Sequence, residues 1–472
     1  MEIRSPQLER TLTLRGAVTL NLLDMIGVGP FLTLPLLLAA MGGPQAMLGW
    51  LLGALLAVCD GLVWAELGAM MPEAGGTYAY LGKMFPGRVG RWLSFLFVFQ
   101  LCFSAPLSVA SGCIGLSQYA GFLWPGFVSR AQVHALHVGA YTFGVSAGRG
   151  QLVAIAAVGL AVVLLYRRLS EVKWLGVGML VVVLATMAFA MVTGVLHGHW
   201  SRVVEFPAGA WHLDQRFFAG LGSAMLIATY DYWGYYNVTF LGGEVRDAGR
   251  VIPRAVMLSI GVVAVLYVGL NVSVLSVMGA PAMMAVKDVG GRQALLSTMM
   301  QVAYGPEMGP MLGKIAALMV MVTAFASVFS LLLGYSRIPF AAARDGNFIA
   351  AFGRLHRTRG FPVVSLLGLA GMACLFCFFS LGDVIAALVG LRILLQFGVQ
   401  HVGVMVLRVR RPEWVRPFRM WWYPVPPVLA LVGFAYVVVS RANFHREVML
   451  AGMVGVVGTV VFLGRQRVEG RE

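Results

Sequence analysis

The stretch DMIGVGPFLTLP, Asp24 to Pro35, interrupts the first long apolar segment of the chain near its middle. Gly27 and Gly29 have no side chain to restrict the backbone, and Pro30 lacks an N–H and clashes with the preceding turn, so a helix is expected to unwind here. Unwinding leaves backbone N–H and C=O groups without partners, and such groups cannot face lipid. If the segment crosses a bilayer, its broken backbone must face protein, water or a ligand.

The composition is that of a polytopic membrane protein. Of the 472 residues, 59% are hydrophobic and only 12% are charged, with a mean hydropathy of +0.82. Soluble domains are roughly 45–50% apolar and 25% charged. Apolar segments of about 20 residues, the length that crosses a bilayer as a helix, recur along the whole chain. We therefore expect the lipid bilayer as a partner, and little of the chain remains for a soluble domain.

The pattern predicts an all-α integral membrane protein with twelve transmembrane helices. The predicted spans are 16–40, 44–71, 92–123, 151–166, 174–196, 217–241, 255–278, 311–343, 362–380, 384–407, 424–440 and 447–464.

The net charge of +15 follows from membrane topology and does not indicate a nucleic-acid partner. With these spans, most of the 35 Lys and Arg residues fall in the segments that share one side of the membrane with both termini. Such a bias marks the cytoplasmic side. We expect cytoplasmic N- and C-termini, and an inner-membrane location if the protein is bacterial.

A second interruption lies in the sixth predicted span, at TYDYWGYYN, Thr229 to Asn237. Paired breaks in corresponding spans of two halves are typical of transporters with inverted repeats. We therefore predict a transport core at 1–410, with repeats at about 16–196 and 217–407, followed by two peripheral helices and a cytoplasmic tail at 411–472. The alternative is that the glycines permit close helix packing and the proline makes only a kink.

The two breaks offer complementary binding groups. The N-terminus of a half-helix presents N–H donors and the positive end of a dipole, which suit a carboxylate. The carbonyl groups freed in the sixth span suit an ammonium group.

Several motifs together resemble the amino acid-polyamine-organocation superfamily of transporters. They are MIGVGPF (25–31), WAELGAMMPEAGGTYAYL (64–81), GGEVRDAGRVIPRAV (242–256), SRIPFAAARDGNF (336–348) and LRVRRPEWVRPFRMWWYPVPP (407–427). They occur in order over essentially the whole chain. One departure is Pro30, which stands where that family usually has a branched aliphatic residue.

The resemblance implies a five-plus-five inverted repeat with substrate bound between the breaks of spans 1 and 6. It implies that the backbone of the first break holds a substrate carboxylate and that of the second holds the amino group. The substrate-binding residues that the resemblance implies are Gly27, Val28, Gly29, Thr229, Tyr230 and Tyr232. From their places in or beside the two breaks we add Asp24, Ile26, Asp231 and Gly234 as candidates, although the family usually has small or neutral residues at positions 24 and 231. The resemblance also implies that Glu66, Glu244 and Arg337 form ion pairs of the cytoplasmic gate.

Ionisable side chains within spans need a partner or a task, because each costs about 2.5–3.5 kcal/mol on insertion scales. Here these are Asp24, Asp60, Asp231, Lys314 and Arg392. Since Asp24 and Asp231 adjoin the breaks, they can bind a cationic substrate or pick up a coupling proton. The third alternative is that each caps a broken helix by accepting from free N–H groups.

The coupling ion is left open between a proton and sodium. Thr323, Ser327 and Ser330 in span 8 are candidate sodium ligands, although such hydroxyl groups often bond to the backbone one turn back. The predicted fifth span contains no ionisable residue, whereas proton-coupled relatives of this superfamily often carry a Lys there. Arg392 is expected to pair with Asp60 or with another acid near the pathway, and the alternative is that it contacts the substrate directly.

The leading hypothesis is a secondary transporter, a symporter or exchanger that moves amino acids or related amines by alternating access. Alternatives are a polyamine carrier, and a sensor of transporter fold that binds substrate without net transport. An enzyme is not expected, because the spans contain no metal-binding or nucleophilic motif. An ATP-driven pump is not expected either, because the sequence contains no P-loop motif. We expect no cofactor and no metal.

Overall fold

The structure is a computed structural model that describes Leu8 and residues 10–125, 133–138, 141–167, 169–285, 294–379, 392–440 and 444–469. The long helices are α1 (Leu14–Met25), α3 (Met47–Met70), α5 (Gly87–Leu123), α6 (Arg149–Leu165), α7 (Leu169–His197), α8 (Gln215–Tyr232), α10 (Ala248–Met278), α13 (Leu295–Tyr335), α15 (Val363–Phe376), α17 (Gly398–Arg410), α18 (Val425–Val439) and α19 (Phe444–Glu469).

The shorter elements connect or interrupt these helices. They are the helices α2 (Leu34–Met41), α4 (Thr77–Met84), α9 (Asn237–Phe240), α11 (Ala280–Ala285) and α14 (Arg337–Arg344), the 3-10 turns η1 (Gly29–Phe31), η2 (Pro44–Ala46), η3 (Trp200–Val204), η4 (Gly242–Glu244) and η5 (Ala350–Gly353), the π-helical turn η6 (Ile393–Phe397), and the strands β1 (Val133–Val138) and β2 (Tyr141–Ser146).

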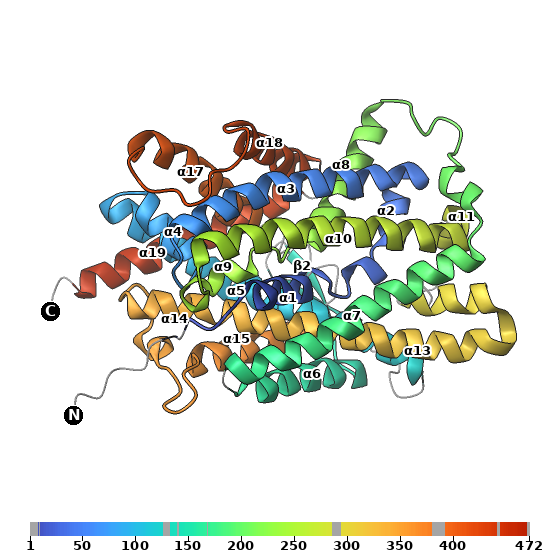
Figure 1. Cartoon of the computed structure of the whole chain (residues 1–472), viewed down its shortest axis with the longest axis horizontal. Helices are drawn as coiled ribbons and strands as arrows, with labels where there is room; N and C mark the ends of the chain where they lie inside the picture. Colours follow the sequence, from blue (N-terminus) through green and yellow to red (C-terminus); the bar gives the residue numbers. More distant parts are fainter. Residues whose placement is uncertain are drawn as a thin grey trace.

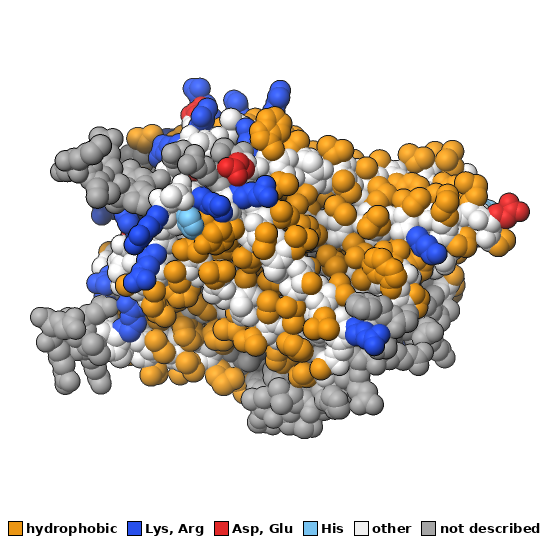
Figure 2. All heavy atoms as spheres, turned by 90° about the horizontal axis from the view of Figure 1, so that it is seen from below, with side chains coloured by type: hydrophobic (Ala, Val, Ile, Leu, Met, Phe, Trp, Pro, Cys, Tyr) orange, Lys and Arg blue, Asp and Glu red, His pale blue; other side chains and the backbone are white. Residues whose placement is uncertain are grey.

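The long helices run along the long axis of the molecule (Figure 1). α3 packs against α10, and α13 packs against both α5 and α7. Both ends of the chain lie at the same end of the molecule in this view. Hydrophobic side chains cover much of the face shown in Figure 2, while Lys and Arg gather mainly toward that same end. This surface fits a bundle whose sides contact lipid.

The predicted spans overlap helices or broken helices wherever they fall within the described residues. Residue 380 of the predicted ninth span and 384–391 of the tenth lie outside them. In the described part of the chain, five helices are long and apolar enough to cross a membrane, and the bent pair Leu14–Phe31 and Leu34–Met41 makes a sixth. The chain is thus an almost wholly helical, multi-pass membrane protein. The count of twelve spans stays a prediction.

The prediction for span 8 was wrong at its C-terminal end. Gly305 (φ 68°) divides α13 into two helices, of which the second starts near the predicted residue 311, and α14 is separate from α13 although one span to 343 was predicted. The prediction also omitted an antiparallel hairpin, in which Val133 of β1 lies opposite Ser146 of β2 and Val138 opposite Tyr141.

The first span is broken as predicted. α1 ends at Met25, the chain forms the 3-10 turn η1 around Pro30, and α2 begins at Leu34. The two halves are bent by 60°. Tyr119 of α5 donates a hydrogen bond to the carbonyl oxygen of Phe31 over 2.9 Å, so part of the exposed backbone is satisfied by a neighbouring helix.

The sixth span is broken between α8 and α9, and this break packs on the first. Gly234 has a φ of 125°, which side-chain-bearing residues rarely adopt. A β carbon added to Gly234 would lie 2.7 Å from the backbone nitrogen of Met25. Glycine is required here both by its conformation and by the close approach of the other break.

Polar side chains join the two breaks. The Asn21 side chain donates to the carbonyl oxygen of Tyr235 over 2.6 Å and accepts from the N–H of Val238 over 2.9 Å. The hydroxyl of Tyr267 on α10 lies 2.5 Å from the carbonyl oxygen of Met25 and 3.2 Å from that of Asp231. Backbone groups freed by unwinding are therefore paired across the interface between the breaks.

We predict that Asn21→Ala lowers the free energy of unfolding by about 2–4 kcal/mol, because two buried backbone groups lose their partner at about 1–3 kcal/mol each. Thermal unfolding of the purified protein in detergent measures the effect. Asn271→Ala is the matched control, because Asn271 is also fully buried but its amide donates only to the Tyr267 carbonyl one turn back. Equal losses in the two variants would contradict the role assigned to Asn21.

Candidate functional site

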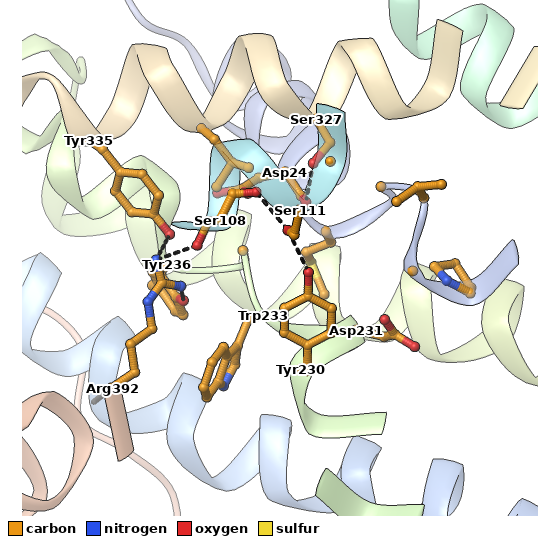
Figure 3. Close-up of a pocket in the computed structure, with 18 residues that line it drawn as sticks. Asp24, Ser108, Ser111, Tyr230, Asp231, Trp233, Tyr236, Ser327, Tyr335 and Arg392 are labelled. Carbon is orange, nitrogen blue, oxygen red and sulfur yellow. Dashed lines mark hydrogen bonds between the residues drawn. The ribbon is translucent and has the colours of Figure 1, made fainter. Parts of the chain in front are cut away.

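A cavity of about 60 Å³ lies between the two breaks (Figure 3). It is bounded by the broken spans and by α5, α13 and the residue that precedes η6. The lining residues are Asp24, Met25, Gly27, Val28, Gly29, Pro30, Ser108, Ser111, Gly112, Tyr230, Asp231, Trp233, Gly234, Tyr236, Ser327, Leu331, Tyr335 and Arg392.

The helix ends give the cavity two electrostatic sides. α1 ends at Met25 and α8 at Tyr232, so the negative ends of two helix dipoles converge on it. The first break also lines the cavity, and within the described residues no hydrogen bond engages the N–H groups of Val28 and Gly29. The site thus presents acceptors from two helix C-termini and free donors from the first break.

Asp24 and Asp231 lie at the acceptor side, with 6% and 4% of their surfaces exposed. The carboxylate of Asp24 has no hydrogen-bond partner in the described structure, and its Oδ2 is fully buried. The Asp231 Oδ2 accepts from the Thr33 hydroxyl over 2.6 Å, whereas its Oδ1 has no partner. A β carbon added to Gly29 would lie 1.9 Å from this Oδ1, so the carboxylate rests against the first break.

The helix-cap alternative for these aspartates is wrong. Both are near the C-terminal ends of their helices, where carbonyl groups and not N–H groups are free. In the described residues, neither carboxylate accepts from a backbone N–H. A carboxylate beside a negative dipole end is unfavourable, so each favours a nearby positive charge.

Arg392 brings a positive charge to the same cavity. Its guanidinium donates to the hydroxyl groups of Ser108 (2.8 Å), Tyr335 (2.6 Å) and Tyr236 (3.1 Å). Its Cζ lies 5.6 Å from the centre of the Trp233 ring, a cation–π distance. Figure 3 shows these residues converging at one side of the cavity.

The expected pairing of Arg392 with Asp60 does not occur. No carboxylate among the described residues lies within ion-pair distance of Arg392. Asp60 contacts His401 instead, at 3.1 Å between Oδ1 and Nε2. The guanidinium of Arg392 contacts hydroxyl groups and aromatic rings instead, because it points into the cavity and not toward α3.

The structure brings most of the predicted binding residues together, but not all of them. Ile26, Thr229 and Tyr232 do not line the cavity. The ring of Tyr232 packs against Trp50 and Tyr267, because at the end of α8 it points into the core. Their predicted roles concern the backbone and stay predictions.

Sequence reasoning missed the lining residues contributed by α5 and by the second break. Ser108 and Ser111 lie on one face of α5, and the Ser111 hydroxyl is 2.8 Å from that of Tyr230. The available signal was weak, a series of serines around Pro106 inside a long apolar helix. Trp233, Tyr236 and Tyr335 were also missed, since aromatic residues in an apolar span usually indicate packing.

Two of the three predicted gate residues form an ion pair. The guanidinium of Arg337 donates to the carboxylate of Glu244, with Nε 2.8 Å from Oε1, and both side chains are nearly buried. Glu66 is not part of this pair. It accepts from Arg408 and from the N–H of Met420, because the segment after α17 folds back over the end of α3.

The candidate sodium ligands of α13 make different contacts. Thr323 donates to the Met319 carbonyl one turn back, over 2.9 Å. Ser327 donates to the carbonyl oxygen of Asp24 over 3.2 Å, and Ser330 to that of Leu20 over 2.8 Å. Two of these hydroxyl groups therefore join α13 to α1. A coupling role for Thr323 and Ser327 stays a prediction.

Comparisons with known proteins assign a family. The family model described as amino acid permease matches residues 12–461. The serine/threonine exchanger SteT of Bacillus subtilis is 24% identical over 476 residues, covering 98% of both chains. An uncharacterized transporter of Mycobacterium tuberculosis is 30% identical over 344 residues, covering 72% of this chain and 67% of its own. The human Asc-type amino acid transporter 1 is 24% identical over 466 residues, covering 97% of this chain and 81% of its own.

We predict that Gly29→Ala destabilises the protein through its overlap with Asp231. In an Asp231→Ala background the loss should shrink by about 1 kcal/mol, within the range of coupling energies between contacting residues. Thermal unfolding of the two single variants and the double variant measures the coupling. Gly261→Ala in α10, where no atom lies within 4 Å of the added carbon, is the control and should change stability little. Strict additivity at Gly29 and Asp231 would refute the contact.

Proposed function

The chain belongs to the amino acid permease family, and from this premise we propose that it moves an amino acid or related amine across a membrane by alternating access. The chain is a permease and not an enzyme. The relatives from Bacillus subtilis and human named above are likewise an exchanger and a transporter. The observation that carries the proposal is the cavity between two broken helices, which is lined by free N–H donors of the first break and by acceptors at two helix C-termini.

The proposed architecture has twelve membrane-spanning helices. Residues 1–410 would form the transport core, with repeats at about 16–196 and 217–407, and 411–472 would add two peripheral helices and a tail. The positions of the two breaks support this, because α1 and α8 would begin the two repeats. The gathering of Lys and Arg near both termini supports a cytoplasmic location for them, in the inner membrane if the protein is bacterial.

The charge pattern of the cavity suits a zwitterion. A substrate carboxylate can accept from the free N–H groups of Val28 and Gly29. A substrate ammonium can lie near the ends of α1 and α8, where two helix dipoles and the carboxylates of Asp24 and Asp231 all favour positive charge. Arg392 adds a positive group at the edge that Ser108 and Tyr335 line, facing the side chain of such a substrate.

The ion pair between Glu244 and Arg337 is proposed as a gate contact. Glu244 follows the second break directly, and Arg337 begins α14 after the long helix α13. The charged groups of Glu244 and Arg337 are nearly buried, so separating them requires that water or other side chains solvate each charge. Such a contact holds one conformation until substrate binding supplies the energy to leave it.

We predict that the purified protein in liposomes exchanges labelled external amino acids for unlabelled internal ones. Serine and threonine are the first substrates to test, followed by basic amino acids and polyamines. A thermal-shift screen with the same compounds identifies ligands independently, because a ligand that binds the folded state stabilises it. Binding without exchange would favour a sensor, and activity confined to polyamines would favour a polyamine carrier. If the protein neither binds nor exchanges any of these compounds, the proposal is wrong.

We predict that Asp231→Asn weakens the binding of cationic substrates about tenfold more than the binding of neutral ones, since a hydrogen bond to a charged group is worth about 1.5–3 kcal/mol. Competition of each class against a labelled neutral substrate measures the ratio. Asp214→Asn is the control, because Asp214 caps the exposed start of α8. If Asp231→Asn weakened the binding of cationic and neutral substrates equally, Asp231 would have no role in distinguishing substrates by charge.

A further inference from the structure

Asp60 and His401 form a second pair of titratable groups, outside the substrate cavity. Asp60 lies on α3 and His401 on α17, and both side chains are fully buried. The Nε2 atom of His401 is 3.1 Å from Oδ1 of Asp60. An intramembrane pair of this kind is costly and calls for a function.

The contacts fix where protons must be. The Nδ1 atom of His401 lies 2.7 Å from the carbonyl oxygen of Phe397. Since a carbonyl oxygen only accepts, Nδ1 carries a hydrogen. If the imidazole were neutral and Asp60 ionised, the lone pairs of Nε2 and Oδ1 would face each other. A second proton between these two atoms removes that repulsion, whether it resides on the ring or on the carboxyl group.

Asp60 is held by two further donors. Its Oδ2 accepts from the indole N–H of Trp64 over 3.2 Å and from the hydroxyl of Tyr235. Tyr235 belongs to the second break, and its carbonyl oxygen accepts from Asn21 on α1. The pair is therefore linked through Tyr235 to the second break and to α1, the helix that ends at the first break.

We propose that Asp60 and His401 together bind the proton that couples transport, an inference that rests on the proposed function. One proton adds to the neutral imidazole and carboxylate and leaves again when the pair opens to water. With the proton bound, the pair is neutral overall and ties α3 to α17. Without it, a net negative charge remains in the apolar interior, which favours a conformation that hydrates or separates the two helices.

The other titratable and charged groups around the pair are few. Cys59 adjoins Asp60 on α3, and the second break contributes Tyr235 and Tyr236. α18 presents the ring of Phe434, 5.8 Å from that of His401. Tyr236 connects this region to the cavity, because its hydroxyl accepts from Arg392.

Proton-driven accumulation tests the proposal. In liposomes with an alkaline interior and a clamped membrane potential, a one-unit pH gradient can drive about tenfold accumulation for each coupled proton. We expect His401→Gln and Asp60→Asn to abolish this accumulation while exchange at equal pH continues. His197→Gln on α7 is the matched control and should accumulate like the unaltered protein. Accumulation retained by His401→Gln would overturn the proposal.

A milder variant guards against loss of folding. Tyr235→Phe keeps the ring and removes one donor to Asp60, so the charged carboxylate is less stabilised and the midpoint of the pH dependence should move to higher pH. An unchanged midpoint would contradict the link between Tyr235 and the proton site.

A direct measurement separates this proposal from the proposed function. Infrared difference spectra of the purified protein between acid and alkaline pH should show a carboxyl or imidazole band that disappears in both His401→Gln and Asp60→Asn. Absence of that band overturns the proton site even if amino acid exchange is observed. Exchange without pH-driven accumulation in the unaltered protein likewise overturns the inference and leaves the proposed function standing. Failure of exchange with the band present removes the proposed function and the coupling role with it, and leaves Asp60 and His401 as a proton-binding pair alone.

Discussion

The structure depends on one constraint, that backbone groups freed by unwinding a helix inside a membrane need partners other than lipid. The two breaks meet this constraint by lying against each other. Gly234 packs on the backbone at Met25, and the side chains of Asn21 and Tyr267 bond to main-chain groups of both. Among the described residues, the N–H groups of Val28 and Gly29 have no hydrogen-bond partner, and both residues line the cavity. The cavity thus lies where the pairing between the two breaks is incomplete.

The same constraint organises the charges. Helix C-termini end at the cavity and are joined by two aspartates, so positive charge is favoured there. Arg392 supplies a positive charge of the protein's own, without a carboxylate partner among the described residues. A zwitterionic substrate would complete this pattern, which explains in physical terms why breaks of this kind suit amino acids.

Two further buried pairs of ionisable side chains join segments of the described fold. Glu244 and Arg337 join the segment after the second break to the end of α13, and Asp60 and His401 join α3 to α17. In a low-dielectric interior, separating or deprotonating such pairs is costly. They are therefore suited to hold discrete conformations, which is the basis for the proposed gate contact of Glu244 and Arg337 and for the proposed proton site of Asp60 and His401.

The sequence by itself determined the class of protein, the helices and the two breaks, because these depend on local properties: apolar length, glycine and proline, and ordered motifs. It also identified Asp24 and Asp231 by their closeness to the breaks. Only the tertiary structure decided which residues meet. Glu66 contacts Arg408 and not Arg337, Asp60 contacts His401 and not Arg392, and α5 contributes Ser108 and Ser111 to the cavity. Pairing between distant helices depends on their rotation and packing, and an almost uniformly apolar sequence carries little record of which face each helix turns inward.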